Sequence, residues 1–293
     1  MKTKNILGPL LLSLAASIWG GMYVVVKVVV EYIPPVQLVW IRYLIAIIVL
    51  LLFSLLKKEK WQYNHRDLLL ILLIGIIGNV VSILFQETGT WLSDAQTGAV
   101  ITSSTPTFML LFAWKLLKEK LTKVKIFSVA LATVGVIAIV GINLKGQHII
   151  LGVLSLIIAA LTWALMSVLI KMLSGTYSSL QVTILATLFA VIILTPFSLA
   201  QPKVFQNVNF FSPTIVFPLL YLGIISTAVA FIMWNYGLKL TNTSTSGLFF
   251  LLQPIVGTLL GLVFLNEKIT WGFVVGTLLI LVSVWLSLST NNE

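Results

Sequence analysis

The chain has 293 residues, of which 59% are hydrophobic and only 9% are charged. Because a soluble domain carries about 25% charged residues, this composition excludes an ordinary soluble protein and is typical of a membrane protein with many spans. The net charge of +10 comes from basic residues in short loops, which argues against a nucleic-acid-binding protein, and the absence of cysteine excludes disulfides and thiolate metal sites.

Ten apolar runs follow one another along the chain, each about 20 residues long, which is the length of a helix that crosses a bilayer. Backbone polar groups in hydrocarbon must be satisfied within the segment, so we predict helices rather than open strands. The predicted spans lie near residues 6–27, 34–56, 67–90, 95–116, 123–142, 149–171, 178–200, 213–237, 243–264 and 270–289. We therefore expect an all-α membrane protein with ten transmembrane helices.

Basic residues set the predicted orientation. With the N-terminus in the cytoplasm, thirteen Lys and Arg residues fall on the cytoplasmic side, Lys171 and Lys239 among them. Four fall on the outer side: Lys27, Lys145, Lys203 and Lys268. Since cytoplasmic loops are enriched in Lys and Arg, we expect both termini in the cytoplasm and the protein in the cell membrane.

The sequence contains two related halves, residues 1–145 and 146–293. The stretch from Ser93 to Thr122 recurs 148 residues later, and the earlier part of the chain recurs with an offset of 144 residues. The matched pairs include Thr97 and Thr245, Pro106 and Pro254, Glu119 and Glu267, Trp19 and Trp163, and Lys27 and Lys171. Five helices per half is an odd number, so two copies in series must be inverted relative to each other. Inverted repeats are the architecture of secondary transporters, with the substrate site near the midplane; a duplicated passive scaffold is the alternative.

A set of residues distributed over both halves carries a family resemblance. They are Trp19-Gly20, Arg42, Ser93 to Thr97, Pro106, Glu119, Pro254 and Glu267. In these residues the chain resembles the EamA-type transporters of the drug/metabolite transporter superfamily, over nearly its whole length. The resemblance implies ten helices around a central cavity, with the fifth and tenth helices more peripheral. It also implies export of small metabolites, often amino acids or related compounds.

Arg42 and Glu87 are charged residues inside predicted spans. Inserting a central Arg costs about 2.5–3.5 kcal/mol, so Arg42 should face protein or water rather than lipid. Arg42 would anchor a substrate carboxylate, act as a gate partner or make a structural ion pair, for which Glu87 is the best-placed residue. Glu87 would either carry a coupling proton or lie in interfacial water.

Polar and aromatic residues on predicted helix faces are candidates for a substrate cavity. In the third span, a stripe at 100° per residue contains Gly75, Asn79, Ser82, Gln86 and Thr90. Close helix packing accounts for the glycine, whereas buried amides need hydrogen-bond partners and favour a wet cavity. The predicted cavity residues are Ser17, Trp19, Tyr23, Arg42, Asn79, Gln86, Thr97, Trp163, Trp234 and Gln253. Packing is the alternative role for the aromatic ones.

Caps and hinges are predicted at matching positions of the two halves. Asp94 and Asn242 can accept the free amides of a first helical turn, or that positive helix end can hold an anionic group. Pro106 and Pro254 each remove a backbone donor and should bend their helices. We expect Glu267 to pair with nearby lysines or to precede a Thr270 cap.

The predicted function is secondary-active export of a small-molecule substrate across the lipid bilayer by alternating access, with protons as the candidate coupling ion. Three alternatives stay open: an uncoupled facilitator of the same fold, an intramembrane lipid-modifying enzyme and a structural partner subunit. The chain lacks a phosphate-binding Gly-x-x-x-x-Gly-Lys motif, so ATP would not drive the cycle from within it. We predict no cofactor, metal or catalytic site, because His65 and His148 are isolated in loops.

Overall fold

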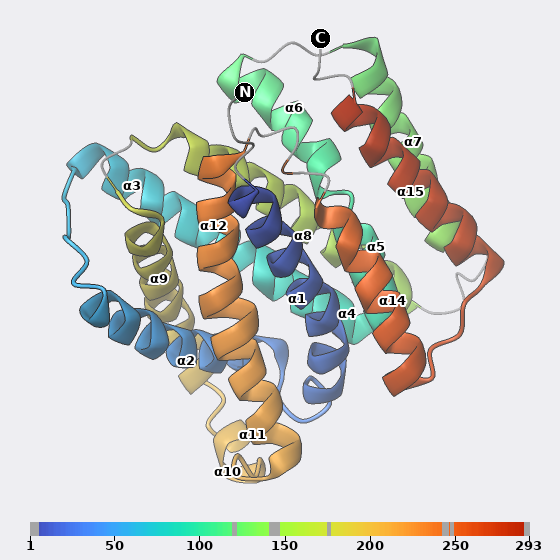
Figure 1. Ribbon diagram of the computed structural model, residues 1–293. Coiled ribbons are helices and arrows are strands. Elements are labelled where there is room, and N and C mark those ends of the chain that lie inside the picture. The colour runs from blue at the N-terminus through green and yellow to red at the C-terminus, as the bar shows by residue number, and fades with distance from the viewer. Residues whose placement is uncertain are drawn as a thin grey trace.

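The computed structural model describes residues 6–118, 122–140, 147–174, 177–241, 246 and 249–289, and every regular element in these ranges is helical (Figure 1). The first half contains α1 (Leu7–Val29), α2 (Pro35–Leu56), α3 (His65–Ile74), η1 (Gly75–Ser82), α4 (Ile83–Leu92), α5 (Ala95–Thr102), α6 (Thr105–Leu117) and α7 (Lys123–Val140). The second contains α8 (Gln147–Met172), α9 (Ser179–Leu199), α10 (Lys203–Asn207), α11 (Pro213–Leu220), η2 (Tyr221–Val229), α12 (Ala230–Leu240), η3 (Phe249–Leu251), α14 (Leu252–Leu265) and α15 (Trp271–Ser289). Glu119 and the predicted cap Asn242 lie outside the described residues.

Within the described residues, seven helices are long and apolar enough to cross a membrane. They are Leu7–Val29, Pro35–Leu56, His65–Leu92, Ala95–Leu117, His148–Met172, Ser179–Leu199 and Pro213–Leu240. Three shorter apolar helices, Ile126–Gly135, Phe249–Leu265 and Trp271–Ser283, coincide with the other three predicted spans. The fold is therefore all-helical and typical of a multi-pass membrane protein.

Helix α1 lies in the middle of the bundle, with α12 on one side and α14 on the other, whereas α7 and α15 pack together at one edge (Figure 1). At Gly20 the backbones of α1 and α14 are so close that a Cβ would lie 2.8 Å from the Gln253 carbonyl oxygen. In the figure, α1 begins and α12 and α15 end at the upper end of the molecule. We call this end the inner end and the opposite one the outer end.

The predicted helix at residues 95–116 is interrupted after Thr102, and Pro106 lies in the first turn of α6. A proline is tolerated there because the first amides of a helix have no partner within it. Hydroxyl groups at the break bind carbonyl groups three residues earlier: Ser103 donates to Val100, Ser104 to Ile101 and Thr105 to Thr102, each at 2.6 Å. Pro254 likewise lies in the first turn of α14, after the short helix η3.

Two π-helical segments, η1 and η2, change the helix period inside long spans. A π-helical turn holds more residues than an α-turn, so it rotates the residues that follow it. The residues of the stripe predicted in the third span nevertheless face the protein on both sides of this change, since Gly75, Asn79, Ser82 and Thr90 are all buried. Ser82 donates to the Ala159 carbonyl group of α8 at 2.8 Å, and Thr90 donates to its own helix at Gln86.

Candidate functional site

A buried cavity lies in the centre of the bundle and receives side chains from both halves of the chain. The first half contributes Trp19, Met22, Tyr23, Arg42, Ile83, Gln86, Thr102 and Thr105, and the second contributes Ala159, Ala160, Trp163, Phe231, Phe250 and Gln253. The volume open to the centres of water-sized molecules is about 20 Å³. A cavity of this size holds little more than one ordered water, so the structure is a closed form of the site.

Arg42 forms the polar wall of this cavity and is fully buried. Its guanidinium group makes an ion pair with Glu87 of α4, whose side chain is also inaccessible to solvent. The other nitrogens reach the π-helical segment η2: Nε donates to the Thr227 hydroxyl and Nη2 to the Ser226 hydroxyl, both at 2.9 Å. Arg42 thus connects α2, α4 and η2, as a buried cation in a membrane protein should.

Glu87 is completely buried, so the expectation that it lies in interfacial water is wrong. One carboxylate oxygen binds Arg42, while Oε2 has no hydrogen-bond partner among the described residues. Leaving one charge of such a pair unpaired costs about 3–5 kcal/mol, so each partner strongly depends on the other. An unsatisfied carboxylate oxygen is the atom on which a proton or a ligand donor would be stabilised.

A chain of hydrogen-bonded side chains extends across the cavity from α1 to α14. The Tyr23 hydroxyl lies 2.5 Å from the Thr102 hydroxyl and 3.2 Å from Gln86 Oε1. Thr102 lies at the interruption between α5 and α6, and its hydroxyl is 3.2 Å from Gln253 Oε1. The two glutamine amides can therefore exchange a partner in this chain for a polar group of a ligand.

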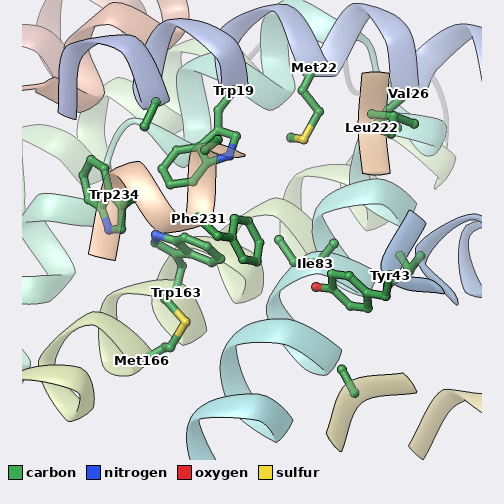
Figure 2. Close-up of a cluster of buried hydrophobic side chains, with 14 of the residues drawn as sticks. Trp19, Met22, Val26, Tyr43, Ile83, Trp163, Met166, Leu222, Phe231 and Trp234 are labelled. Carbon is green, nitrogen blue, oxygen red and sulfur yellow. The ribbon is translucent and has the colours of Figure 1, made fainter. Parts of the chain in front are cut away.

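Aromatic rings close the cavity on the side facing α8 and α12 (Figure 2). The Trp19 ring centroid is 5.3 Å from that of Trp163 and 5.2 Å from that of Trp234. Phe231 packs edge-on against Trp163 at 5.4 Å, and Phe250 packs against Trp234 at 4.6 Å. The indole N–H groups of Trp163 and Trp234 have no partner among the described residues. Buried indole N–H groups normally find one, so they are available to an acceptor.

Six of the ten predicted cavity residues line this cavity: Trp19, Tyr23, Arg42, Gln86, Trp163 and Gln253. Trp234 packs behind the aromatic wall and lines a smaller neighbouring cavity with Asn79. The Asn79 side-chain amide donates to Thr187 at 3.2 Å, and the Asn79 backbone carbonyl oxygen accepts from the Tyr43 hydroxyl at 2.7 Å. Ser17 and Thr97 line neither cavity.

Asp94 is the N-cap of α5 and accepts hydrogen bonds from the Thr97 amide and hydroxyl at 2.7 and 2.9 Å. Of the two expected roles of Glu267, it precedes a Thr270 cap, since the Thr270 hydroxyl accepts the Phe273 amide at 3.1 Å, and no ion pair between Glu267 and a lysine is present among the described residues. The Glu267 carboxylate accepts the backbone amides of Ala95 at 2.7 Å and Gln96 at 3.1 Å, at the start of α5. Burial raises the pKa of Glu267 above the ordinary glutamate value, an effect that the amide of Ala95 partly offsets.

Several site residues carried no sequence signal of their own. Met22, Phe231 and Phe250 are ordinary apolar residues in apolar helices, and Ser226 and Thr227 are small hydroxyl residues of a kind found in many spans. The Ser226 carbonyl group accepts the Trp19 indole N–H at 3.0 Å, and the π-helical geometry of η2 makes this contact possible. Gly223 could have indicated the close approach of α2 and η2, since a Cβ there would lie 2.6 Å from Ile45.

Comparison with known proteins identifies the family. The sequence profile of the EamA-like transporter family matches residues 6–141 and again residues 150–289. The chain belongs to the EamA-like transporter family. An EamA-like chain is a multi-pass membrane protein, in agreement with the apolar helices of the fold. The drug/metabolite transporter resemblance inferred from the motifs is confirmed.

Curated relatives extend over most of the EamA-like chain. An uncharacterized transporter of Clostridium kluyveri is 27% identical over 267 residues, covering 88% of this chain and 85% of the relative. A probable amino-acid metabolite efflux pump of Salmonella typhimurium is 24% identical over 287 residues, covering 94% and 92%. A solved crystal structure with 17% identity superposes with a TM-score of 0.69 over 97% of this chain and 96% of the other, which shows the fold alone.

Proposed function

We propose that the protein is a secondary-active transporter that exports small metabolites, such as amino acids or related amphipathic compounds, across the cell membrane by alternating access. The observation that carries the proposal is the central cavity, whose walls come from both halves of the chain. It combines a flat aromatic surface with amides and an ion pair. Ligand sites in proteins have this composition, a mostly apolar wall with a few polar groups that fix orientation.

The proposed architecture is ten spans in two inverted units of five, residues 1–145 and 146–293. The two successive matches to the family profile support this division. So do local features that recur 148 residues apart: the left-handed helix ends at Lys118 and Asn266, with φ of 60° and 52°, and the starts of α7 and α15. The distribution of basic residues supports placing the inner end in the cytoplasm.

The Arg42–Glu87 pair is the proposed centre of substrate and proton handling. A ligand donor or a proton that reaches Glu87 Oε2 would weaken the ion pair and free the Arg42 guanidinium group for a substrate carboxylate. A charge-assisted, bidentate contact of this kind is strong and directional. Uncoupled facilitation is the second candidate, and it is favoured by the same ion pair, since a glutamate held by arginine in every state would keep no proton.

Transport by purified protein in proteoliposomes tests the proposal. The panel contains amino acids, nucleosides and cationic drugs, each measured with and without an imposed pH gradient. We expect at least one compound to cross, and Arg42→Met to abolish its transport. Lys203→Met, which removes an exposed cation from the short helix α10, is the matched control and should transport normally. Absence of transport across the whole panel would contradict the proposal.

Glu87→Gln separates the coupled transporter from the facilitator. In a proton-coupled exporter this variant loses stimulation by the pH gradient but keeps exchange of labelled substrate across the membrane. In a facilitator the wild-type protein itself is insensitive to the gradient. Stimulation that survives in Glu87→Gln would remove this residue from proton coupling.

A further inference from the structure

Lys27 binds the end of α4 at the outer end of the molecule. From the last turn of α1 its Nζ donates to three backbone carbonyl oxygens at the end of α4. The acceptors are Thr90 at 3.3 Å, Trp91 at 2.9 Å and Ser93 at 2.6 Å. Carbonyl groups at a helix C-terminus lack partners within the helix and carry its negative dipole end, so a cation there is stabilised.

Glu267 binds the residues that follow the turn between α4 and α5. Its carboxylate accepts the first amides of α5, which follow the turn directly. The turn between α4 and α5 is therefore fixed by a cation from α1 and by an anion that follows α14. Because Glu267 belongs to the second half and the turn to the first, the Glu267 contacts tie the halves together at the outer end, whereas the Lys27 contacts lie within the first half.

The inner end holds the equivalent residues around an open cavity. In the second repeat, Lys171 corresponds to Lys27 at an offset of 144 residues. Leu238, Lys239 and Thr241 correspond to Thr90, Trp91 and Ser93 at an offset of 148 residues. All four of these equivalents line a cavity of about 490 Å³ between the end of α8 and the end of α12. On the same measure the central cavity is about 20 Å³. The residues that correspond to Lys27 and its three acceptors therefore border an open cavity at the inner end.

This inner cavity leads toward the centre. A small intermediate cavity shares Ile170, Val182 and Asn235 with the inner one and shares Trp163 and Phe231 with the central one. The structure is thus open at the inner end, and the inner cavity narrows to the intermediate cavity of about 10 Å³ before the aromatic wall. Among the residues that the structure describes, only Trp163 and Phe231 border both the intermediate and the central cavity.

We propose that Lys27 and Lys171 are alternating latches: Lys27 closes the outer end on the carbonyl groups that end α4, and Lys171 closes the inner end on those that end α12 in the opposite state. The inference rests on the proposed inverted repeat and alternating access, and it assigns the state described here as open to the inner side. When Lys171 moves onto Leu238, Lys239 and Thr241, the inner cavity closes. The turn between α4 and α5 is then free to separate from Lys27 and Glu267.

Accessibility of introduced cysteines tests the latches without any substrate, because the natural chain has no cysteine. Ala95→Cys reports on the outer end, where Ala95 is fully buried, and Ser179→Cys reports on the inner cavity that it lines. The full-length protein in proteoliposomes is labelled with a polar maleimide. We expect Lys27→Met to raise the labelling rate of Ala95→Cys about tenfold, the equivalent of one charged hydrogen bond, and to lower that of Ser179→Cys.

Lys171→Met should act in the opposite direction on both reporters, and the double variant should return toward the wild-type rates. Lys203→Met is the control for a lost surface cation and should change neither rate; size-exclusion profiles establish that each variant is folded. Two Lys→Met variants that shift the reporters in the same direction, or leave both unchanged, would overturn the latch proposal. Transport that is normal in that case would leave the proposed function standing, whereas opposite shifts without transport of any compound would contradict only the function.

Discussion

The central cavity and the α7–α15 pair are both contacts between the two halves of the chain, yet they are built from different chemistry. Around the cavity, a buried ion pair, two glutamine amides and five aromatic rings meet, and some of their polar atoms have no partner among the described residues. Between α7 and α15, small residues meet instead. Ser283 donates to the Ser128 carbonyl group at 2.7 Å, and a Cβ on Gly135 would lie 2.8 Å from the Gly276 carbonyl oxygen.

The difference in chemistry indicates that the α7–α15 contact holds the two halves together, and it supports the proposal that the central cavity binds a ligand. Small residues allow two helices to approach closely and gain van der Waals contact, which is enough for association in lipid. A charged pair costs free energy to bury and gives no advantage in stability over an apolar contact of the same volume. The proposed function gives a reason for its presence in the centre, whereas packing accounts for the α7–α15 contact.

Breaking the ion pair should have the largest effect. Arg42→Met leaves the Glu87 carboxylate buried and unpaired, so we expect a loss of about 3–5 kcal/mol in the free energy of unfolding, together with loss of transport. Adding Glu87→Gln removes the stranded charge and should recover most of the stability but no transport. Thermal unfolding in detergent and flux in proteoliposomes measure the two effects. Full transport by the double variant would mean that the pair is only structural.

Crowding the α7–α15 contact should have an intermediate effect on stability and, in contrast to Arg42→Met, no effect on transport. Gly135→Ala places a methyl group against Gly276 and Ile280 of α15, and overpacking of this kind costs about 1–3 kcal/mol. We expect a lower midpoint of thermal unfolding but an unchanged transport rate per folded molecule. Val134→Ala, on the exposed face of α7, is the control for the same helix. A Gly135→Ala protein that is folded but inactive would show that the α7–α15 contact takes part in transport.

Removing one hydroxyl group from the central cavity and one from the α7–α15 contact should have the smallest effects. Thr102→Val and Ser283→Ala each remove a buried hydroxyl group, and each should cost about 1 kcal/mol of stability. Only Thr102→Val removes the group that links Tyr23 to Gln253, so only this variant should raise the substrate KM, by several-fold. Initial rates over a range of substrate concentrations distinguish them. Equal KM values for both variants would mean that the Tyr23–Gln253 chain does not touch the substrate.

The sequence predicted features that depend on a residue's own chemistry. Arg42 and Glu87 stand out in apolar spans, and Asp94 precedes a helix that it can cap, so their roles follow from burial and from free amides. The π-helical segments left no comparable signal, since no residue type is required for an extra residue in a turn. Asn79 and Ser82 lie within η1 and outside the central cavity, whereas Gln86, which follows η1, lines it.

Contacts between segments that are distant in the sequence were the second feature that the sequence did not predict. Arg42 meets Thr227 at a separation of 185 residues, and the backbone amide of Gln96 meets Glu267 at a separation of 171 residues. Lysines close to Glu267 in sequence suggested ion pairs, but the backbone amides of α5 are better placed in space. Such partners depend on how the helices pack rather than on local residue patterns.

Protection of a single cysteine by substrate tests the central cavity most directly. Ala160→Cys introduces a thiol into the cavity wall, and Lys123→Cys introduces one at the exposed start of α7. A compound that the protein transports should slow labelling of Ala160→Cys at the concentrations that saturate transport, and should leave the labelling of Lys123→Cys unchanged. Labelling of Ala160→Cys at the same rate with and without saturating substrate would contradict the assignment of this cavity as the transport site.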